Sequence, residues 1–165
     1  MKATSLLEKQ HRKVEAIFKK LEGGRSEAAP LLTELANDIA AHMMIEQEIF
    51  YPAVREVKED LVLEAYEEHA VAEFALKRLL ETKPSDETFL AKVTTLKELI
   101  DHHVKEEEDV LFPKVEKEIE EKLLTELGKQ MKARFEEVLE EGYEAVLTRS
   151  KAKRRAEGAH ANTSK

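Results

Sequence analysis

The sequence predicts an all-α fold, an up-down-up-down four-helix bundle with an additional C-terminal helix and a disordered basic tail. Three observations support this prediction. The 165-residue chain is 38% charged and has only five glycines and four prolines, a composition that favours helices over strands. Apolar residues recur at steps of three and four along four segments. Turn-forming residues such as Gly23-Gly24 and Lys83-Pro84-Ser85-Asp86 separate these segments.

The first helix is expected to end at about Leu21, before the two glycines. Ser5 and Glu8 have the spacing of a capping box at its start. Its apolar seam includes one histidine among the residues Leu7, His11, Val14, Phe18 and Leu21. His11 is therefore expected to point into the bundle.

The second helix begins near Pro30, and Pro52 is expected to kink or end it, because proline lacks a backbone donor and clashes with the preceding turn. The third helix covers about residues 60–82, and the fourth runs to Pro113. Polar residues again interrupt the apolar seams of these three helices, at His42, Glu46, His69, His103 and Glu107.

Residues 1–148 are expected to form one domain, with the core bundle at about 4–120 and the C-terminal helix at about 115–148. From Arg149 onward the apolar period is lost, so residues 149–165 are expected to be a disordered basic tail. The tail carries a charge of +5 within a total of −8, which leaves the body strongly acidic. We expect no nucleic-acid binding by the folded part.

The chain has no cysteine, which excludes disulfides, iron–sulfur clusters and thiolate zinc sites. Any bound metal must therefore be held by nitrogen and oxygen ligands. The N-terminus lacks the apolar region of a signal peptide, and no stretch approaches the roughly 20 apolar residues of a membrane helix. A cytoplasmic protein without membrane association is expected, while its oligomeric state cannot be predicted.

The two halves of the chain repeat each other. The segment from His42 through Glu46 to Pro52 matches the segment from His103 through Glu107 to Pro113 at an offset of 61 residues. The pair His11 and Glu15 matches His69 and Glu73 at an offset of 58 residues, as the numbering shows. Two helix pairs related in this way predict a pseudo-two-fold bundle.

This repeat predicts a two-metal site. Residues four apart lie on one face of a helix, so each His-x-x-x-Glu pair can direct an imidazole and a carboxylate to one point. With one histidine from each of the other two helices, the core would hold four imidazoles and two carboxylates. An ion-pair network without metal is the alternative. Nitrogen and oxygen ligands suit iron, and manganese and zinc remain alternative metals.

These residues resemble the hemerythrin-like family, and in particular the bacterial hemerythrin HHE cation-binding domains, over about residues 4–120. The resemblance implies an oxo- or hydroxo-bridged pair of non-haem iron ions, with Glu46 and Glu107 as the bridging carboxylates. The ligands that it implies are His11, His42, Glu46, His69, His103 and Glu107.

The chain departs from the oxygen-carrying hemerythrins at one position. Those proteins have a second histidine one turn after the first on the third helix, whereas this chain has Glu73. Glu73, and Glu15 by symmetry, are therefore candidate additional ligands, and reversible oxygen carriage is in doubt. Beside the ligands, His102 is expected at the surface or next to the site, Glu106 and Glu108 in solvent, and Tyr51 has no assigned role.

The leading functional prediction is a protein that binds dioxygen, nitric oxide or peroxide for storage, sensing or scavenging, rather than an enzyme. The alternative is a di-iron enzyme with peroxidase- or catalase-like or iron-oxidising activity. A ferritin-like site is disfavoured, because only Glu8 and His11 have the required Glu-x-x-His spacing. Iron–sulfur repair proteins with a hemerythrin-like domain carry a cysteine-containing segment that this chain lacks.

Overall fold

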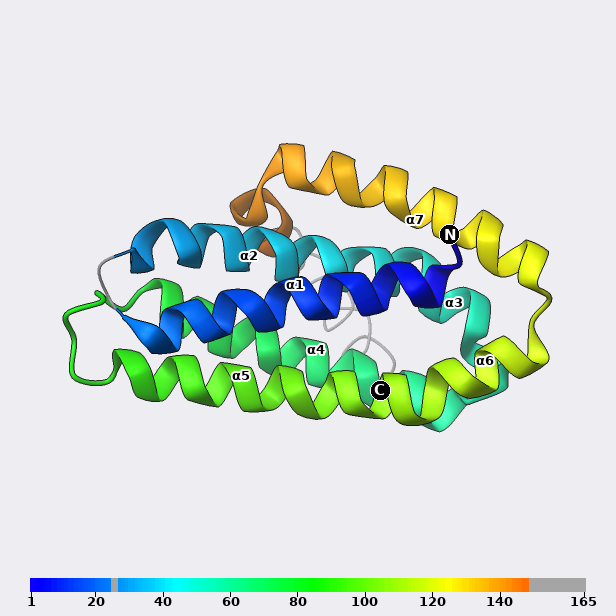
Figure 1. Ribbon diagram of the computed structural model, residues 1–165, viewed down its shortest axis with the longest axis horizontal. Helices are drawn as coiled ribbons and strands as arrows, with labels where there is room; N and C mark the ends of the chain where they lie inside the picture. Colours follow the sequence, from blue (N-terminus) through cyan, green and yellow to red (C-terminus); the bar gives the residue numbers. More distant parts are fainter. Residues whose placement is uncertain (25–26, 149–165) are drawn as a thin grey trace, which may run out of the picture.

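The computed structural model describes residues 1–24 and 27–148, and all regular elements within these ranges are helical (Figure 1). The expected basic tail, residues 149–165, lies outside the described residues. The bundle is formed by the four long helices α1 (Ala3–Gly23), α2 (Ala28–Ile45), α4 (Glu59–Leu80) and α5 (Phe89–Glu106). The predicted four-helix bundle is thereby confirmed.

The four helices form a closed ring, in which α1 contacts α2 and α5, and α4 contacts α2 and α5. Figure 1 shows their axes running side by side along the length of the molecule. Each helix therefore turns one face toward a common centre. The apolar seams predicted from the sequence occupy this centre, as shown by the complete burial of Leu7, Leu35, Leu76 and Leu96.

Two short π-helical segments interrupt the bundle at equivalent points of the repeat. One spans Glu46–Phe50 and leads into α3 (Tyr51–Val54), and the other spans Glu107–Leu111 and leads into α6 (Phe112–Glu118). Each begins at a glutamate of the repeated motif. π-Helical turns of this kind are frequent at functional sites.

Pro52 does not end the helix. The chain instead widens into a π-helical segment just before Pro52 and then continues as α3. The backbone N–H of Tyr51 donates to the Glu46 carbonyl, five residues back, in place of the usual four. This wider turn comes directly before Pro52, which has no backbone N–H to donate. Pro113 follows the second π-helical segment in the same way, with the Phe112 N–H bonded to the Glu107 carbonyl.

A 3₁₀ turn at Arg55–Val57 leads from α3 to α4. After α6 the chain folds back as α7 (Glu121–Glu141), which packs against α1 and α2. This is the additional C-terminal helix predicted from the sequence. The capping box expected at Ser5 is wrong, because α1 already begins at Ala3 and has no side-chain cap. The extra turn lies where the N-terminus packs against Gly128 of α7.

The buried apolar side chains form two large clusters toward the two ends of the bundle. One contains Phe18 and Phe89, and the other contains Phe50, Tyr51 and Phe112. The buried histidines and glutamates belong to neither cluster. Within the described residues, no helix combines the length and the apolar character needed to cross a membrane.

Candidate metal centre

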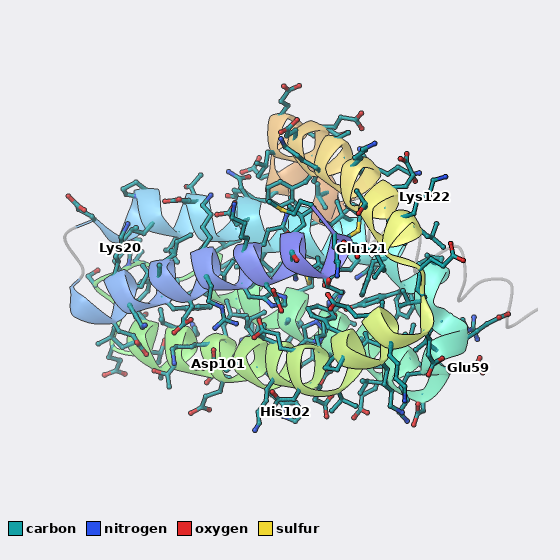
Figure 2. All side chains as sticks on the ribbon, turned by 45° about the vertical axis from the view of Figure 1, so that its right-hand side comes forward. Lys20, Glu59, Asp101, His102, Glu121 and Lys122 are labelled. Atoms are coloured by element: carbon teal, nitrogen blue, oxygen red, sulfur yellow. The ribbon has the colours of Figure 1, made fainter. Side chains whose placement is uncertain are left out.

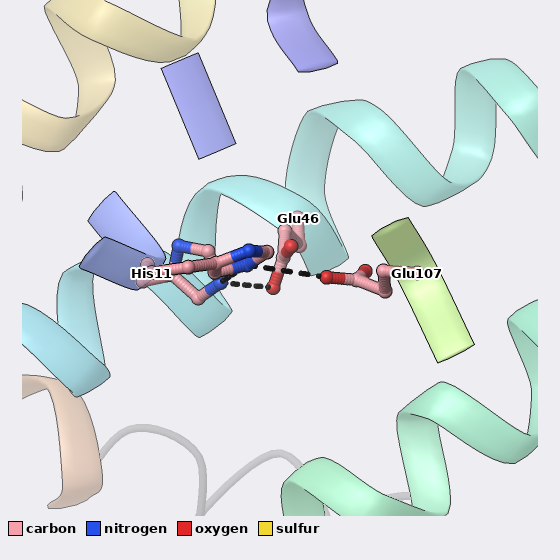
Figure 3. A group of neighbouring side chains, drawn as sticks. His11, Glu46 and Glu107 are labelled. Carbon is pink, nitrogen blue, oxygen red and sulfur yellow. Dashed lines mark hydrogen bonds and ion pairs between the residues drawn. The ribbon is translucent and has the colours of Figure 1, made fainter. Parts of the chain in front are cut away.

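Six buried polar side chains converge in the middle of the bundle. α1, α2, α4 and α5 each contribute one histidine, and the two π-helical segments each contribute their first residue. Figure 3 shows Glu46 and Glu107 pointing toward His11. All six are buried, and the two glutamates are only 0% and 1% exposed. The six residues are His11, His42, Glu46, His69, His103 and Glu107.

The ligand atoms of these residues form two groups that share Glu46. His11, His42, Glu46 and Glu107 form one group, and Glu46, His69 and His103 form the other, with the ligand atoms of each group within 4.8 Å of one another. Glu46 Oε2 lies 3.2 Å from His42 Nε2 and 3.3 Å from His69 Nε2. A single carboxylate oxygen thus faces both groups.

Glu107, the equivalent of Glu46 in the second half of the chain, also lies close to both histidine pairs. Its Oε2 atom lies 3.3 Å from His11 Nε2 and 3.6 Å from His103 Nε2. The two glutamates therefore occupy equivalent bridging positions between the histidine pairs. This arrangement has the approximate two-fold symmetry that the sequence repeat predicts.

The unpaired atoms of the site fit metal ligands. Within the described residues, both carboxylate oxygens of Glu46 and the Oε2 of Glu107 are buried without a hydrogen-bond partner. Buried carboxylates in this state are costly unless a cation compensates them. The spacings of 3.2 and 3.3 Å also match the edges of a coordination polyhedron, which are about 3.0–3.4 Å for metal–ligand bonds near 2.1 Å.

The outer ring nitrogens of the histidines are all held by polar side chains. His11 Nδ1 bonds to Glu108, and His42 Nδ1 donates to Gln10 Oε1, both at 2.8 Å. His103 Nδ1 donates to Glu68 at 2.7 Å, and His69 Nδ1 contacts the Gln47 amide at 2.9 Å. Such partners fix the orientation of each ring and direct Nε2 inward.

These orientations leave imidazole nitrogens facing each other. His11 Nε2 and His42 Nε2 are 3.2 Å apart, and His69 Nε2 and His103 Nε2 are 3.1 Å apart. In the first pair both Nδ1 atoms face acceptors, so both Nε2 atoms carry a lone pair in the neutral rings. Two lone pairs at this distance require a cation or a shared proton between them.

The sequence repeat extends to the residues that hold the histidines. At the same offsets of 58 and 61 residues, Gln10 corresponds to Glu68, and Gln47 corresponds to Glu108. Each histidine pair is therefore supported by one carboxylate and one amide. The two histidine pairs therefore have the same number of charged supporting groups.

Tyr51 breaks the two-fold symmetry. Its hydroxyl donates to Glu107 Oε1 at 2.9 Å and lies 3.2 Å from His69 Nε2 and 3.3 Å from His103 Nε2. The equivalent residue in the second half is Phe112, which has no hydroxyl and stacks on His11. The position between His69 and His103 thus has a phenol oxygen within reach, and the position between His11 and His42 does not.

The surroundings shift the pKa values of the site groups in the protein without metal. Burial alone would lower the pKa of His103, but the Glu107 and Glu68 carboxylates raise it to about 9. His11 shows the same balance, in which Glu107 outweighs burial and the pKa is raised. Burial prevails for His69 and lowers its pKa. The imidazoles of His42 and His69 outweigh burial at Glu46 and hold its pKa well below the usual range.

The two additional candidate ligands lie apart from both groups of ligand atoms. Glu15 is 38% exposed and pairs with Arg12 and Lys19. Glu73 is buried, but it accepts a hydrogen bond from Lys77 at 2.6 Å. Neither belongs to a group of ligand atoms within the described residues.

A small cavity adjoins the site. Its volume is about 20 Å³, and since one water needs roughly 10–15 Å³, it has room for one or two water-sized molecules. All four histidines line it, together with apolar side chains that include Val14, Ile39, Met43, Ala72 and Ile100. A small apolar molecule can therefore lie against the imidazoles.

Sequence reasoning missed the functional roles of Gln10, Gln47, Glu68, Glu108 and Tyr51. Glu108 was expected in solvent, but it holds His11 and also pairs with Arg12. The internal repeat carried a usable signal, because polar residues recur at both pairs of supporting positions. The residue types alone gave no reason to select them.

Comparisons with known proteins agree with this geometry. Residues 2–115 match the hemerythrin HHE cation binding domain family. A solved structure of a hemerythrin HHE cation binding domain-containing protein from Mycobacterium kansasii is 26% identical and superimposes with a TM-score of 0.79, over 91% of this chain and 99% of that one.

A protein from Nostoc sp. described as a DNA nickase is 27% identical over 115 residues, which are 68% of this chain. The match spans only 33% of that relative. The family match covers residues 2–115, more than two thirds of the chain, and identifies this chain as a member of the hemerythrin HHE cation-binding domain family.

Proposed function

We propose that the six central residues hold two iron ions and that the centre binds dioxygen, nitric oxide or peroxide. The observation that carries this proposal is the pair of ligand groups joined by Glu46, with Glu107 in the equivalent bridging position. One mononuclear site would leave a histidine pair without a cation. Iron suits nitrogen and carboxylate ligands with open positions, and manganese and zinc are the alternatives that metal analysis separates.

The chain's own residues favour one protected and one accessible metal position. Tyr51 presents its hydroxyl to His69 and His103, whereas Phe112 places only a hydrocarbon ring beside His11. If Glu107 bridges, the position at His11 and His42 has four protein ligands, whereas Tyr51 gives the position at His69 and His103 a fifth. The apolar cavity, which all four histidines line, reaches the position with fewer ligands. An iron pair in this centre would supply reversible electron transfer to a bound small molecule.

Tyr51 also supports the second candidate function, a di-iron enzyme that reduces peroxide or oxygen. Its buried hydroxyl can donate a proton at the centre through its hydrogen bond to Glu107. Burial and the neighbouring carboxylates raise its pKa well above the usual value, so the metal-free protein keeps this proton in place. A stable adduct indicates a binding protein, whereas repeated consumption of peroxide indicates an enzyme.

The proposal is tested by loading the metal-free protein anaerobically with ferrous iron and then admitting air. We expect two irons per chain and an oxo-to-iron charge-transfer band. Glu46→Ala and Glu107→Ala should each lower the metal content below one ion per chain and lower the melting temperature, because each carboxylate contacts both histidine pairs.

The matched control is Glu48→Ala, which removes a half-exposed carboxylate two residues after Glu46 that pairs with Arg134. This variant should retain both irons. Glu15→Gln should also retain both, since Glu15 is paired at the surface. Wild-type occupancy in both bridging variants would overturn the bridging roles of Glu46 and Glu107.

A further inference from the structure

A second group of ligand-type side chains lies on the surface between α4 and α5. Glu68 from α4 and His102 and Glu106 from α5 bring ligand atoms within 4.8 Å of one another. Figure 2 shows His102 on the outer side of α5, next to Asp101. We propose that these three residues bind one divalent cation, such as zinc or ferrous iron, separately from the central metal pair.

The geometry of the three residues suits one cation. His102 Nε2 lies 3.4 Å from Glu68 Oε1 and 3.7 Å from Glu106 Oε1. His102 and Glu106 are four residues apart on one helix, so they share a face. Imidazole nitrogens and carboxylate oxygens are both zinc ligands, and water can complete four-coordination. The His102–Glu106 distance exceeds the ligand spacing of about 3.0–3.4 Å by a few tenths of an ångström, which a small side-chain rotation can close.

Within the described residues, the carboxylates of this group pair with no lysine or arginine. Among the described residues, the charged partners of Glu68 and Glu106 are histidines alone. By contrast, Asp101 pairs with Lys97, and Glu108 pairs with Arg12. Glu106 Oε2 is shielded from solvent and has no hydrogen-bond partner in the described part of the chain. A cation would compensate Glu106 and would add to the existing pairing of Glu68 with His103.

The sequence repeat shows that this group is not a by-product of the duplicated motif. At the same offsets, His102 corresponds to Ala41 and Glu106 to Ile45. Ala41 and Ile45 are fully buried, and Ala41 packs in a cluster with Val138 near the end of α7. In the described part of the chain, the ligand-type residues thus lie on an exposed face of α5, whereas α7 packs against α2, which carries the equivalent positions.

Glu68 connects the surface group to the central site. Its Oε2 accepts a hydrogen bond from His103 Nδ1 at 2.7 Å, and its Oε1 faces His102. A cation at the surface would draw electron density from this carboxylate and weaken its hydrogen bond to His103. The two sites would then be coupled through one side chain, whatever metal occupies the centre.

The test is equilibrium dialysis of the full chain against zinc, with zinc counted per chain. His102→Ala should remove one zinc ion per chain, and Glu106→Gln should weaken the same ion's binding at least tenfold. The fold should tolerate the first change, because the His102 side chain is 64% exposed. Asp101→Asn is the matched control, since this neighbouring carboxylate pairs with Lys97, and it should leave zinc binding unchanged.

The Glu46→Ala background separates this proposal from the one for the central site. There the surface ion should still bind, and adding His102→Ala should still remove it. Equal zinc content with and without His102 in both backgrounds would overturn the surface site. Broadening of the His102 ring resonance by paramagnetic cobalt(II) gives a second readout, and an unbroadened ring at saturating cobalt would also overturn it.

Discussion

His103 carries a proton in the metal-free protein that a bound metal would replace. Its pKa in the folded chain is about 9, whereas an unfolded histidine titrates near its ordinary value of 6.5. A raised folded pKa contributes stability that is fully present below 6.5 and is lost as the pH rises through 9. We expect the metal-free protein to lose at most about 3–4 kcal/mol of unfolding free energy across this window.

Thermal unfolding in chelator at a series of pH values measures this loss. The lowered pKa of His69 acts in a different window, because it reduces stability as the pH falls below 6.5. The control is His103→Gln, which should flatten the decline between pH 6.5 and 9. An equally steep decline in that variant would assign the effect to another group.

Tyr51 and Phe112 provide a matched pair of residues for testing the asymmetry of the centre. Tyr51→Phe removes the hydroxyl near His69 and His103, and Phe112→Tyr adds one near His11. We expect Tyr51→Phe to keep two irons and lose about 1.5–3 kcal/mol of stability, the usual contribution of a hydrogen bond to a charged group. Its optical spectrum should change, because the oxygen neighbouring one iron is gone.

Phe112→Tyr should make the two metal positions more alike and slow the reaction with dioxygen, because it narrows the accessible position. Optical spectra and stopped-flow mixing with air-saturated buffer measure both effects. Identical spectra and rates in wild type and in both variants would contradict the assigned asymmetry.

At the scale of helices, the first π-helical segment leaves the Gln47 carbonyl without a backbone donor. In a π-helical pattern the Gln47 carbonyl would bond to residue 52, but proline has no N–H. The Tyr66 hydroxyl donates to this carbonyl at 3.2 Å. Tyr66→Phe should therefore lower the unfolding free energy by about 1 kcal/mol.

A double-mutant cycle with Pro52→Ala tests whether Tyr66 replaces the backbone donor that Pro52 lacks. Alanine at position 52 supplies an N–H near the Gln47 carbonyl, so Tyr66→Phe should cost less in that background. Urea unfolding of the four proteins gives the coupling energy, which we expect to be at least about 0.5 kcal/mol. A coupling near zero would mean that water, and not Tyr66, satisfies this carbonyl.

The sequence was sufficient to predict the helices and the group of central residues, for an identifiable reason. His42 and Glu46 lie four apart on an apolar seam and recur as His103 and Glu107, so local periodicity alone turns them inward. The supporting residues depend on which helices adjoin. Glu68 reaches His103 only because α4 packs against α5, and periodicity within one helix contains no such information.

The sequence also did not predict which helices the C-terminal helix packs against. The amphipathic pattern of residues 115–148 predicted a helix with one apolar face, but not that this face would cover α1 and α2. Nor did it predict the π-helical turns, which arise where Pro52 and Pro113 interrupt otherwise regular helices. Bundle architecture follows from local pattern, whereas the placement of a fifth helix follows from surface complementarity.

At the scale of the whole molecule, Gly128 is where the N-terminus and α7 meet. A Cβ atom at this position would collide with the Met1 carbonyl oxygen and approach the Ala3 nitrogen to 3.0 Å. Backbone atoms cannot move aside as a flexible side chain can. Gly128→Ala should therefore destabilise the protein by about 1–3 kcal/mol through overpacking, even though alanine is favoured over glycine within a helix by about 1 kcal/mol.

The matched control is Gly23→Ala at the end of α1, where a Cβ atom would meet no atom within 4 Å. Thermal unfolding of both variants, each with and without metal, should show a lower melting temperature for Gly128→Ala alone. Because α7 packs on α1 and α2 outside the central ligands, its loosening should leave the metal content at two ions per chain. A Gly128→Ala protein as stable as wild type would show that the N-terminus does not fasten α7 to the bundle.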